Sequence, residues 1–176
     1  MDVYGLLREK VFLGQEFLTW LWCMSEEENA LSLSDGTLVE LSLGDRLSLC
    51  PVMGQEGSRV QVRGREVALA EARQALRRGK LVDGLHLGLL IDGEEFWATL
   101  DAASLTPKGL RLPPSAPADG ERNALDALHL ERLALVQGFL RALDGLFAQF
   151  LRERCATLPS EGVIARLHAW AGGGAA

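Results

Sequence analysis

Positive charge is concentrated in one stretch of the sequence, between Arg59 and Lys80. This stretch carries seven Arg and Lys against two Glu, a net charge of +5, and because the whole chain carries −6, the remainder carries −11. Helical side chains four positions apart are about 6 Å apart along the axis, similar to the phosphate spacing on a DNA strand. We therefore predict a salt-sensitive, sequence-independent contact with DNA phosphates, made by Arg63, Arg65, Arg73, Arg77 and Lys80. The alternative is a solvated helix face whose arginines pair with acidic residues elsewhere.

A second group with chemical potential is acidic and surrounds a predicted hairpin. It consists of Asp83, Asp92, Glu94, Glu95 and Asp101. Carboxylates are preferred Mg²⁺ ligands, so a metal-dependent nuclease is one possible function, although acids are also ordinary turn residues. The sequence has no phosphate-binding loop, no His-Glu-x-x-His and no Gly-x-Ser-x-Gly motif, and its three His and three Cys lack metal-ligand spacing. We predict no catalytic residue, metal or cofactor, and hence a non-enzymatic protein.

These groups must be positioned by a core, and the first element able to organise one is the segment from Phe12 to Met24. Leu13, Phe17 and Trp20 begin an apolar stripe with helical spacing. Buried aromatic side chains of this size dominate the energy of a core. We therefore expect a central helix with the other elements packed around it.

Alternating apolar and polar residues after this helix predict half-buried strands at 37–43, 46–50 and 59–63, separated by Gly- and Asp-rich turns. Helical periodicity at 67–78 predicts an inserted helix. Two further strands, at 81–91 and 95–100, flank Asp92-Gly93, a strong hairpin signal, and 109–112 is a possible last strand. The predicted fold class is α+β: a mostly antiparallel meander with an inserted helix, packed on the aromatic helix, in a domain spanning residues 1–112.

Residues 113–121 form a Pro-rich linker, and residues 122–176 form a helical region. The apolar arc of its long helix, about 122–154, is wider than the ~100° that a surface helix needs. This width predicts packing on more than one face, either in the chain's own core or against a second copy. If it forms a homodimer, the dimerisation residues are expected to be Leu128, Leu135, Phe139, Leu143, Leu146 and Phe150.

The composition, 48% hydrophobic and 24% charged, is that of an ordinary globular protein. We find no signal-peptide pattern at Met1–Gly5 and no apolar run long enough to cross a bilayer. The expected compartment is therefore the cytoplasm, with no membrane partner.

Several short motifs, in the order of these elements, resemble the C-terminal half of the RdgC family of recombination-associated proteins over most of residues 12–155. They are Leu18-Thr19-x-x-Trp22; Val60-Gln-Val-Arg63-Gly-Arg65-Glu66; Arg78-Gly79-Lys80-Leu81-Val82 with Leu85 and Leu87; Phe96 and Asp101; and Leu110-x-Leu112-Pro113 before the aliphatic last helix.

The resemblance implies a nucleoid-associated, ring-like dimer that binds duplex and single-stranded DNA without sequence preference and restrains the RecA recombinase. It also implies that a basic turn, here Arg63 and Arg65, contributes to the positive inner surface of the ring. The chain departs from the family by lacking its N-terminal half, by being acidic, and by having Gly64 where a basic residue is expected. The alternative function is a protein-interaction module whose acidic surface and apolar last helix bind a partner, such as a recombination protein or a chain supplying the missing half.

Overall fold

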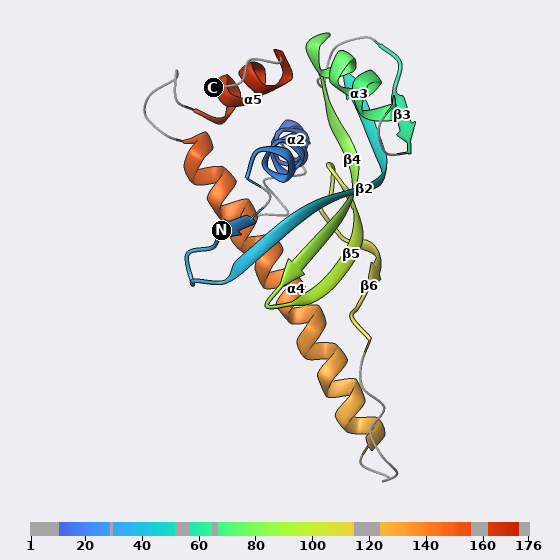
Figure 1. Ribbon diagram of the computed structural model, residues 1–176, viewed down its shortest axis with the longest axis vertical. Coiled ribbons are helices and arrows are strands. Elements are labelled where there is room, and N and C mark those ends of the chain that lie inside the picture. The colour runs from blue at the N-terminus through green and yellow to red at the C-terminus, as the bar shows by residue number, and fades with distance from the viewer. Residues whose placement is uncertain are drawn as a thin grey trace.

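The computed structural model describes residues 11–28, 30–51, 57–64, 67–114, 124–155 and 162–172. In these residues the predicted α+β fold is confirmed: an antiparallel sheet is packed against helices, and a long helix follows it in the sequence (Figure 1). The elements in chain order are α2 (Val11–Glu27), β1 (Ala30–Ser32), β2 (Leu38–Pro51), β3 (Val60–Arg63), α3 (Val67–Arg77), β4 (Lys80–Ile91), β5 (Glu94–Asp101), β6 (Lys108–Arg111), α4 (Ala124–Arg154) and α5 (Val163–Gly172).

Helix α2 is the central element, as its aromatic stripe predicted. Every residue from Leu13 to Met24 is buried, including the polar Gln15 and Thr19. The helix contacts β2 and β4 of the sheet as well as α4 and α5. Burial on all sides explains why its apolar arc is so wide, because a helix covered by both a sheet and other helices has no face left for solvent.

The described strands form a six-stranded sheet in the order β1-β2-β4-β5-β6, and β3 pairs with β2 on the same edge as β1. Inward and outward residues alternate, as in β5, where Phe96, Ala98 and Leu100 are buried and their neighbours are not. The Asp92-Gly93 hairpin is confirmed, since both residues have positive φ (51° and 85°), as a two-residue turn of this type requires. One face of the sheet therefore covers the core, and the other, called here the open face, is exposed or half-buried.

The turn predicted at Gly44-Asp45 is wrong, because β2 continues through it as a single strand of 14 residues. The two predicted strands are joined by a bulge, where the pairing of β2 with β4 shifts between Leu43 and Leu47. A bulge accommodates the extra residues by bending the strand without ending it. The sheet is also not a simple meander, because β4 returns through α3 to pair with β2, and the three-residue strand β1 was not predicted.

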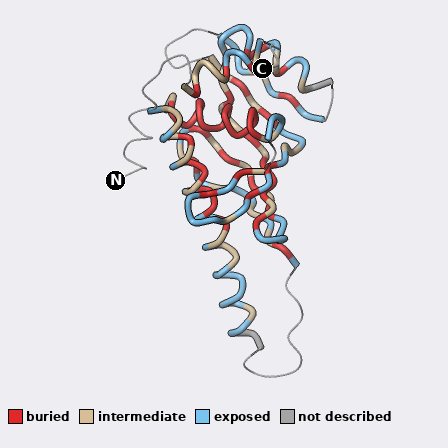
Figure 2. Tube along the Cα trace, turned by 60° about the vertical axis from the view of Figure 1, so that its left-hand side comes forward, coloured by how far each residue is buried: buried red, intermediate tan, exposed pale blue. Residues whose placement is uncertain are grey.

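Helix α4 has two different halves. From Phe139 to Phe150 its inward residues are buried against the core, with the ring of Phe139 5.8 Å from that of Phe96 in β5, and Phe147 5.0 Å from Phe17 in α2. The first half, which we call the stem (126–138), extends beyond the sheet and is largely exposed (Figures 1 and 2). The predicted linker lies mostly outside the described residues.

None of the described helices combines the length and apolar character needed to cross a membrane.

Candidate nucleic-acid interface

The five predicted DNA contacts do not form one surface in the described residues. Arg73, on α3, forms a salt bridge with Glu26 of α2, and its guanidinium carbon lies 5.9 Å from the centre of the Trp170 ring. Arg77 donates a hydrogen bond from Nε to the carbonyl oxygen of Ala171, in the last turn of α5, at 2.8 Å. The stripe on α3 therefore holds α3, α2 and α5 together, which is the alternative that the sequence left open.

The other three predicted residues have different surroundings. Lys80 donates from Nζ to the carbonyl oxygen of Ser58, 2.6 Å away. Arg65 lies outside the described residues. Arg63, at the end of β3, is exposed and forms no ion pair with a described acidic residue. Of the five, Arg63 is the one whose described surroundings leave its charge available to a ligand.

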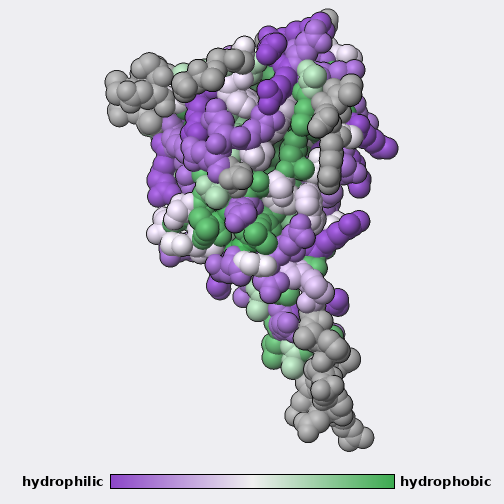
Figure 3. Space-filling view, in the orientation of Figure 1, coloured by the Kyte–Doolittle hydropathy of each residue, from purple (hydrophilic) through white to green (hydrophobic). Residues whose placement is uncertain are grey.

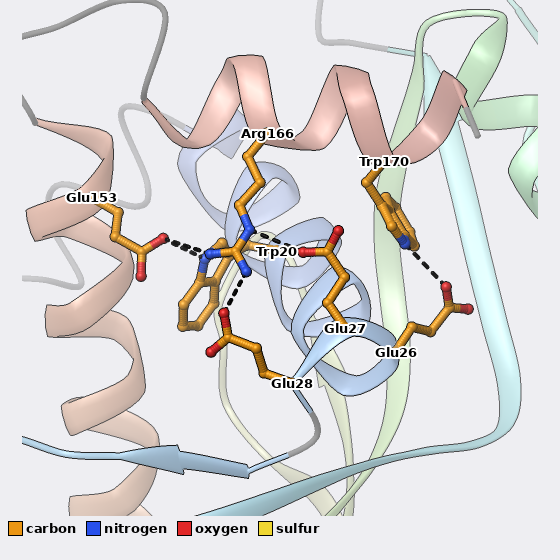
Figure 4. A network of polar contacts seen from close by, with 7 residues as sticks. All are labelled: Trp20, Glu26, Glu27, Glu28, Glu153, Arg166 and Trp170. Atoms are coloured by element: carbon orange, nitrogen blue, oxygen red, sulfur yellow. Dashed lines mark hydrogen bonds and ion pairs between the residues drawn. The ribbon is translucent and has the colours of Figure 1, made fainter. Parts of the chain in front are cut away.

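The role of Arg73 is explained by the charge at the end of α2. Three consecutive acids, Glu26, Glu27 and Glu28, lie where the partial negative charge of a helix C-terminus makes carboxylates unfavourable. Arg166 of α5 offsets this charge by pairing with Glu27 at 3.0 Å and Glu28 at 2.6 Å (Figure 4). Burial alone would lower the pKa of Arg166, but the hydrogen bonds to Glu28 and Glu27 outweigh it and raise that pKa.

Two indole groups extend this network to other elements. Trp170 Nε1 donates to Glu26 at 3.0 Å, and Trp20 Nε1 donates to Glu153 of α4, also at 3.0 Å. Glu153 lies 3.9 Å from Arg166 as well. Acidic and basic residues that are distant in the sequence thus form one network of ion pairs and hydrogen bonds between helices. Their charges are paired within the protein.

The open face of the sheet carries a different pair of cations. Arg46 of β2 and Arg63 of β3 are directly opposite each other in the antiparallel register, so both side chains lie on the same face. Both residues are exposed, and Arg46 is 3.6 Å from the neighbouring Asp45. Like charges placed directly opposite destabilise a sheet, and a bound anion between them would remove that repulsion.

A groove with a volume of about 170 Å³ lies beside this pair. Residues of four strands line it. The polar and small members are Arg46, Ser48, Gln61, Arg63, Gly84 and Thr99, and the apolar members are the core residues Leu47, Val62 and Leu85. The two arginines are the charged residues in this lining, so the groove is positive. Its hydroxyl and amide groups are further hydrogen-bond donors for an anion.

An aromatic pair lies next to the groove on the open face. The rings of His86 in β4 and Trp97 in β5 are 5.2 Å apart, with 45° between their planes. His86 Nδ1 is 2.8 Å from an oxygen of Asp45, and this hydrogen bond lowers the pKa of Asp45 below its ordinary value of 3.8. Sequence analysis missed Arg46 and Trp97, although the period-two pattern of their strands could have placed both outward.

Two of the five acids of the predicted nuclease site form ion pairs with basic residues. Asp83 forms a salt bridge with Arg59, and Asp101 lies 3.8 Å from Lys108. Within the described residues no group of three or more His, Cys, Asp or Glu is arranged to hold a metal ion.

Four of the six predicted dimerisation residues lie inside the molecule, which corrects their assignment to a surface. Phe139, Leu143, Leu146 and Phe150 are at most 6% exposed because that half of α4 packs on α2 and the sheet. Leu128 and Leu135, on the stem, are half-buried. The large apolar side chains that α4 does expose were not predicted; they are Leu130, Leu133 and Leu140, at 68%, 59% and 39%.

A second cavity, of about 340 Å³, lies between α2, α3, α5 and β4. Its lining is mainly apolar, and three of its polar side chains, those of Glu16, Thr19 and Lys80, have partners in the protein. Glu16 accepts a hydrogen bond from Arg154 at 2.8 Å, and Thr19 accepts one from the backbone N–H of Val82 at 3.0 Å. The fourth, His168, has no hydrogen-bond partner among the described residues but is exposed, so the cavity contains no buried, unpaired polar side chain that would define a ligand.

A comparison with known protein families finds no matching model, and comparisons with curated proteins and with solved structures find no match.

Proposed function

We propose that this protein is a non-enzymatic, sequence-independent DNA-binding protein that acts in recombination or replication, as its resemblance to the RdgC family implies. Nucleoid association would result from that activity. The observation that carries the proposal is the pair Arg46 and Arg63, placed opposite each other beside a positive groove on the open face. The proposed contact keeps Arg63 from the sequence prediction and replaces the stripe on α3 with Arg46.

The chemistry of the groove suits a phosphate backbone. Two guanidinium groups on one face can each donate hydrogen bonds to phosphate oxygens, and Ser48, Gln61 and Thr99 can add further ones. Such contacts read no base, and they release counterions, so the affinity should fall steeply with salt. The overall charge of −6 limits binding to this local positive surface.

The test is the binding of a labelled DNA duplex, measured by fluorescence anisotropy at a series of salt concentrations. Replacing both arginines (Arg46→Gln with Arg63→Gln) should weaken binding at least 10-fold and reduce the salt slope by about 2, because each phosphate contact contributes roughly 0.9 to that slope. The matched control, Arg141→Gln with Arg152→Gln, makes the same charge change at exposed positions of α4 outside the stem and should leave the slope unchanged.

Two outcomes would contradict this assignment. If Arg73→Gln with Arg77→Gln abolishes binding while the groove variant does not, the α3 stripe is the contact. If no salt-sensitive complex forms even at low salt, DNA binding is refuted and the interaction module becomes the leading function.

A separate observation supports contact between two copies of the chain. The stem exposes Leu130 and Leu133, which with Leu140 lie three and seven positions apart on one side of α4, and the space-filling view shows hydrophobic surface there (Figure 3). Apolar residues at this spacing form the seam of paired helices. We propose that the stem binds the stem of a second copy, giving the homodimer that the resemblance implies.

Light scattering tests this proposal directly. Leu130→Glu with Leu133→Glu should convert a dimer to a monomer, whereas the control Leu38→Glu, which alters a leucine that is 52% exposed on β2, should not. A monomeric native protein, or a dimer that survives the stem variant, would contradict the proposed interface.

A further inference from the structure

Trp97 is an aromatic residue on a polar surface, and its position there is fixed. The edge of its indole lies over Gly88 of the neighbouring strand, where an added Cβ would be only 2.9 Å from Cζ2 and Cη2 of the ring. Its Nε1 donates to Glu95 at 3.0 Å. Gly88 is thus required by close contact with the ring. The indole is held beside His86 and remains partly exposed.

Cations lie on both sides of this aromatic pair. On one side, Trp97 is paired in register with Arg111 of β6, and Thr99 is paired with Lys108. On the other side, across β4, are Arg46 and Arg63. Because adjacent strands are about 4.8 Å apart, the four steps from β3 to β6 span roughly 19 Å. Across the strands, the open face therefore carries cations on β3 and β2, the aromatic pair on β4 and β5, and further cations on β6.

The acidic side chains on this part of the open face already have partners. Asp45 contacts His86 and Arg46, Asp101 contacts Lys108, and Glu95 accepts the hydrogen bond of Trp97. The charges of Asp45 and Asp101 are partly neutralised by these cations, whereas Glu95 keeps its charge and is held by the indole N–H alone. Arg63 and Arg111 form no ion pair with a described acidic residue.

We infer that the open face binds single-stranded nucleic acid, which lies across the strands with a base stacked on Trp97 and its phosphates near the cations on either side. This inference rests on the proposed DNA binding and names the form of nucleic acid that is bound. In a duplex the bases are stacked on each other, and a ring lying against a sheet cannot reach their faces. An unpaired base can stack on such a ring without regard to its identity.

The experiment compares three labelled probes by fluorescence anisotropy with the full chain: the oligonucleotide dT15, a 15-residue strand of abasic sites, and a 15-bp duplex. The native protein should bind dT15 more tightly than the abasic strand, although the number of phosphates is the same. Trp97→Leu should weaken dT15 binding about 10-fold, within the range of stacking on one aromatic side chain, and should leave the salt slope unchanged. Binding of the abasic strand should not change, and Trp97→Phe should keep most of the affinity for dT15.

The results separate this inference from the proposed function. If the native protein binds none of the probes, both are refuted. If it binds all three equally and Trp97→Leu changes nothing, the charge contact stands and base stacking is refuted. Two results would show that Trp97 supports the sheet and does not stack on a base. One is that Trp97→Phe loses as much dT15 affinity as Trp97→Leu. The other is that Trp97→Leu weakens binding of the abasic strand and of the duplex as much as it weakens binding of dT15.

Discussion

Removing one of the opposed arginines should have opposite effects on stability and on binding. In the free protein, Arg46 and Arg63 repel each other across the strand pair, so Arg63→Gln should raise the free energy of unfolding. The same change would remove a proposed phosphate contact and should weaken polyanion binding. If Arg63 contributed only to the fold, its replacement would not raise stability and weaken binding at the same time.

The expected size is set by the exposure of the pair. Cross-strand pairs contribute roughly 0.2–1 kcal/mol, and two unit charges about 6 Å apart in water repel by roughly 0.7 kcal/mol. Asp45 lies 3.6 Å from Arg46 and reduces this repulsion, and the side chain of Arg46 is 59% exposed, so solvent screens it further. We expect a repulsive coupling of about 0.5 kcal/mol at low salt, falling toward zero near 1 M salt, where the Debye length is about 3 Å.

Urea unfolding of a double-mutant cycle measures this coupling. The cycle comprises the native protein, Arg46→Gln, Arg63→Gln and the double variant, so it isolates the pair from the separate contact with Asp45. Arg63→Gln alone should also weaken binding of a DNA duplex several-fold. A coupling that is zero or favourable at low salt would show that the guanidinium groups do not face each other, and it would remove the physical basis for an anion site between them.

The described contacts lead us to expect three further outcomes. Phe17→Ala should lower the free energy of unfolding by about 3–5 kcal/mol, because Phe17 is fully buried and packs on α4, whereas Leu38→Ala should change it by less than about 0.5 kcal/mol in the same urea titration. His86→Ala should raise the pKa of Asp45 toward 3.8 in an NMR titration. Because the pKa of Asp45 is lowered in the native state, the stability from this contact is fully present above about pH 3.8 and is lost as the pH falls through the native pKa. An unchanged Asp45 pKa would contradict the hydrogen bond. Arg166→Gln should destabilise the docking of α5 by roughly 1 kcal/mol, seen as faster amide exchange in α5 at low salt, and equal exchange in both proteins would show that the acidic end of α2 does not need this cation.

The proposed dimer interface and the proposed nucleic-acid site lie on different parts of the molecule. The stem extends beyond the sheet (Figure 1). Arg46, Arg63 and Trp97 lie on the open face of the sheet. Variants of the stem should therefore change the oligomeric state without removing the positive groove. Loss of DNA binding in a monomeric stem variant would indicate that affinity depends on two copies binding one nucleic acid together.

Local patterns in the sequence determined the elements of this protein. Spacing of three and four residues specified α2, α3 and α4, and alternation with period two specified most strands, because each pattern lets one side of an element be buried. The hairpin at Asp92-Gly93 was also local, since it needs only two residues that tolerate positive φ. The sequence also showed the run of positive charge, but it did not show which of these residues share a surface.

Tertiary structure decided which charges share a surface. Arg63 lies opposite Arg46 because β2 continues through a bulge and β3 pairs with it in one register, and a slip of one residue would have placed the side chains on opposite faces. Arg73 is paired with Glu26 because α3 packs beside the acidic end of α2. The division of α4 into a buried half and a stem likewise depends on where the sheet ends, so its continuous apolar stripe could not reveal it. Charge and hydrophobicity are properties of residues, whereas the surface they form is set by contacts between residues that are distant in the chain.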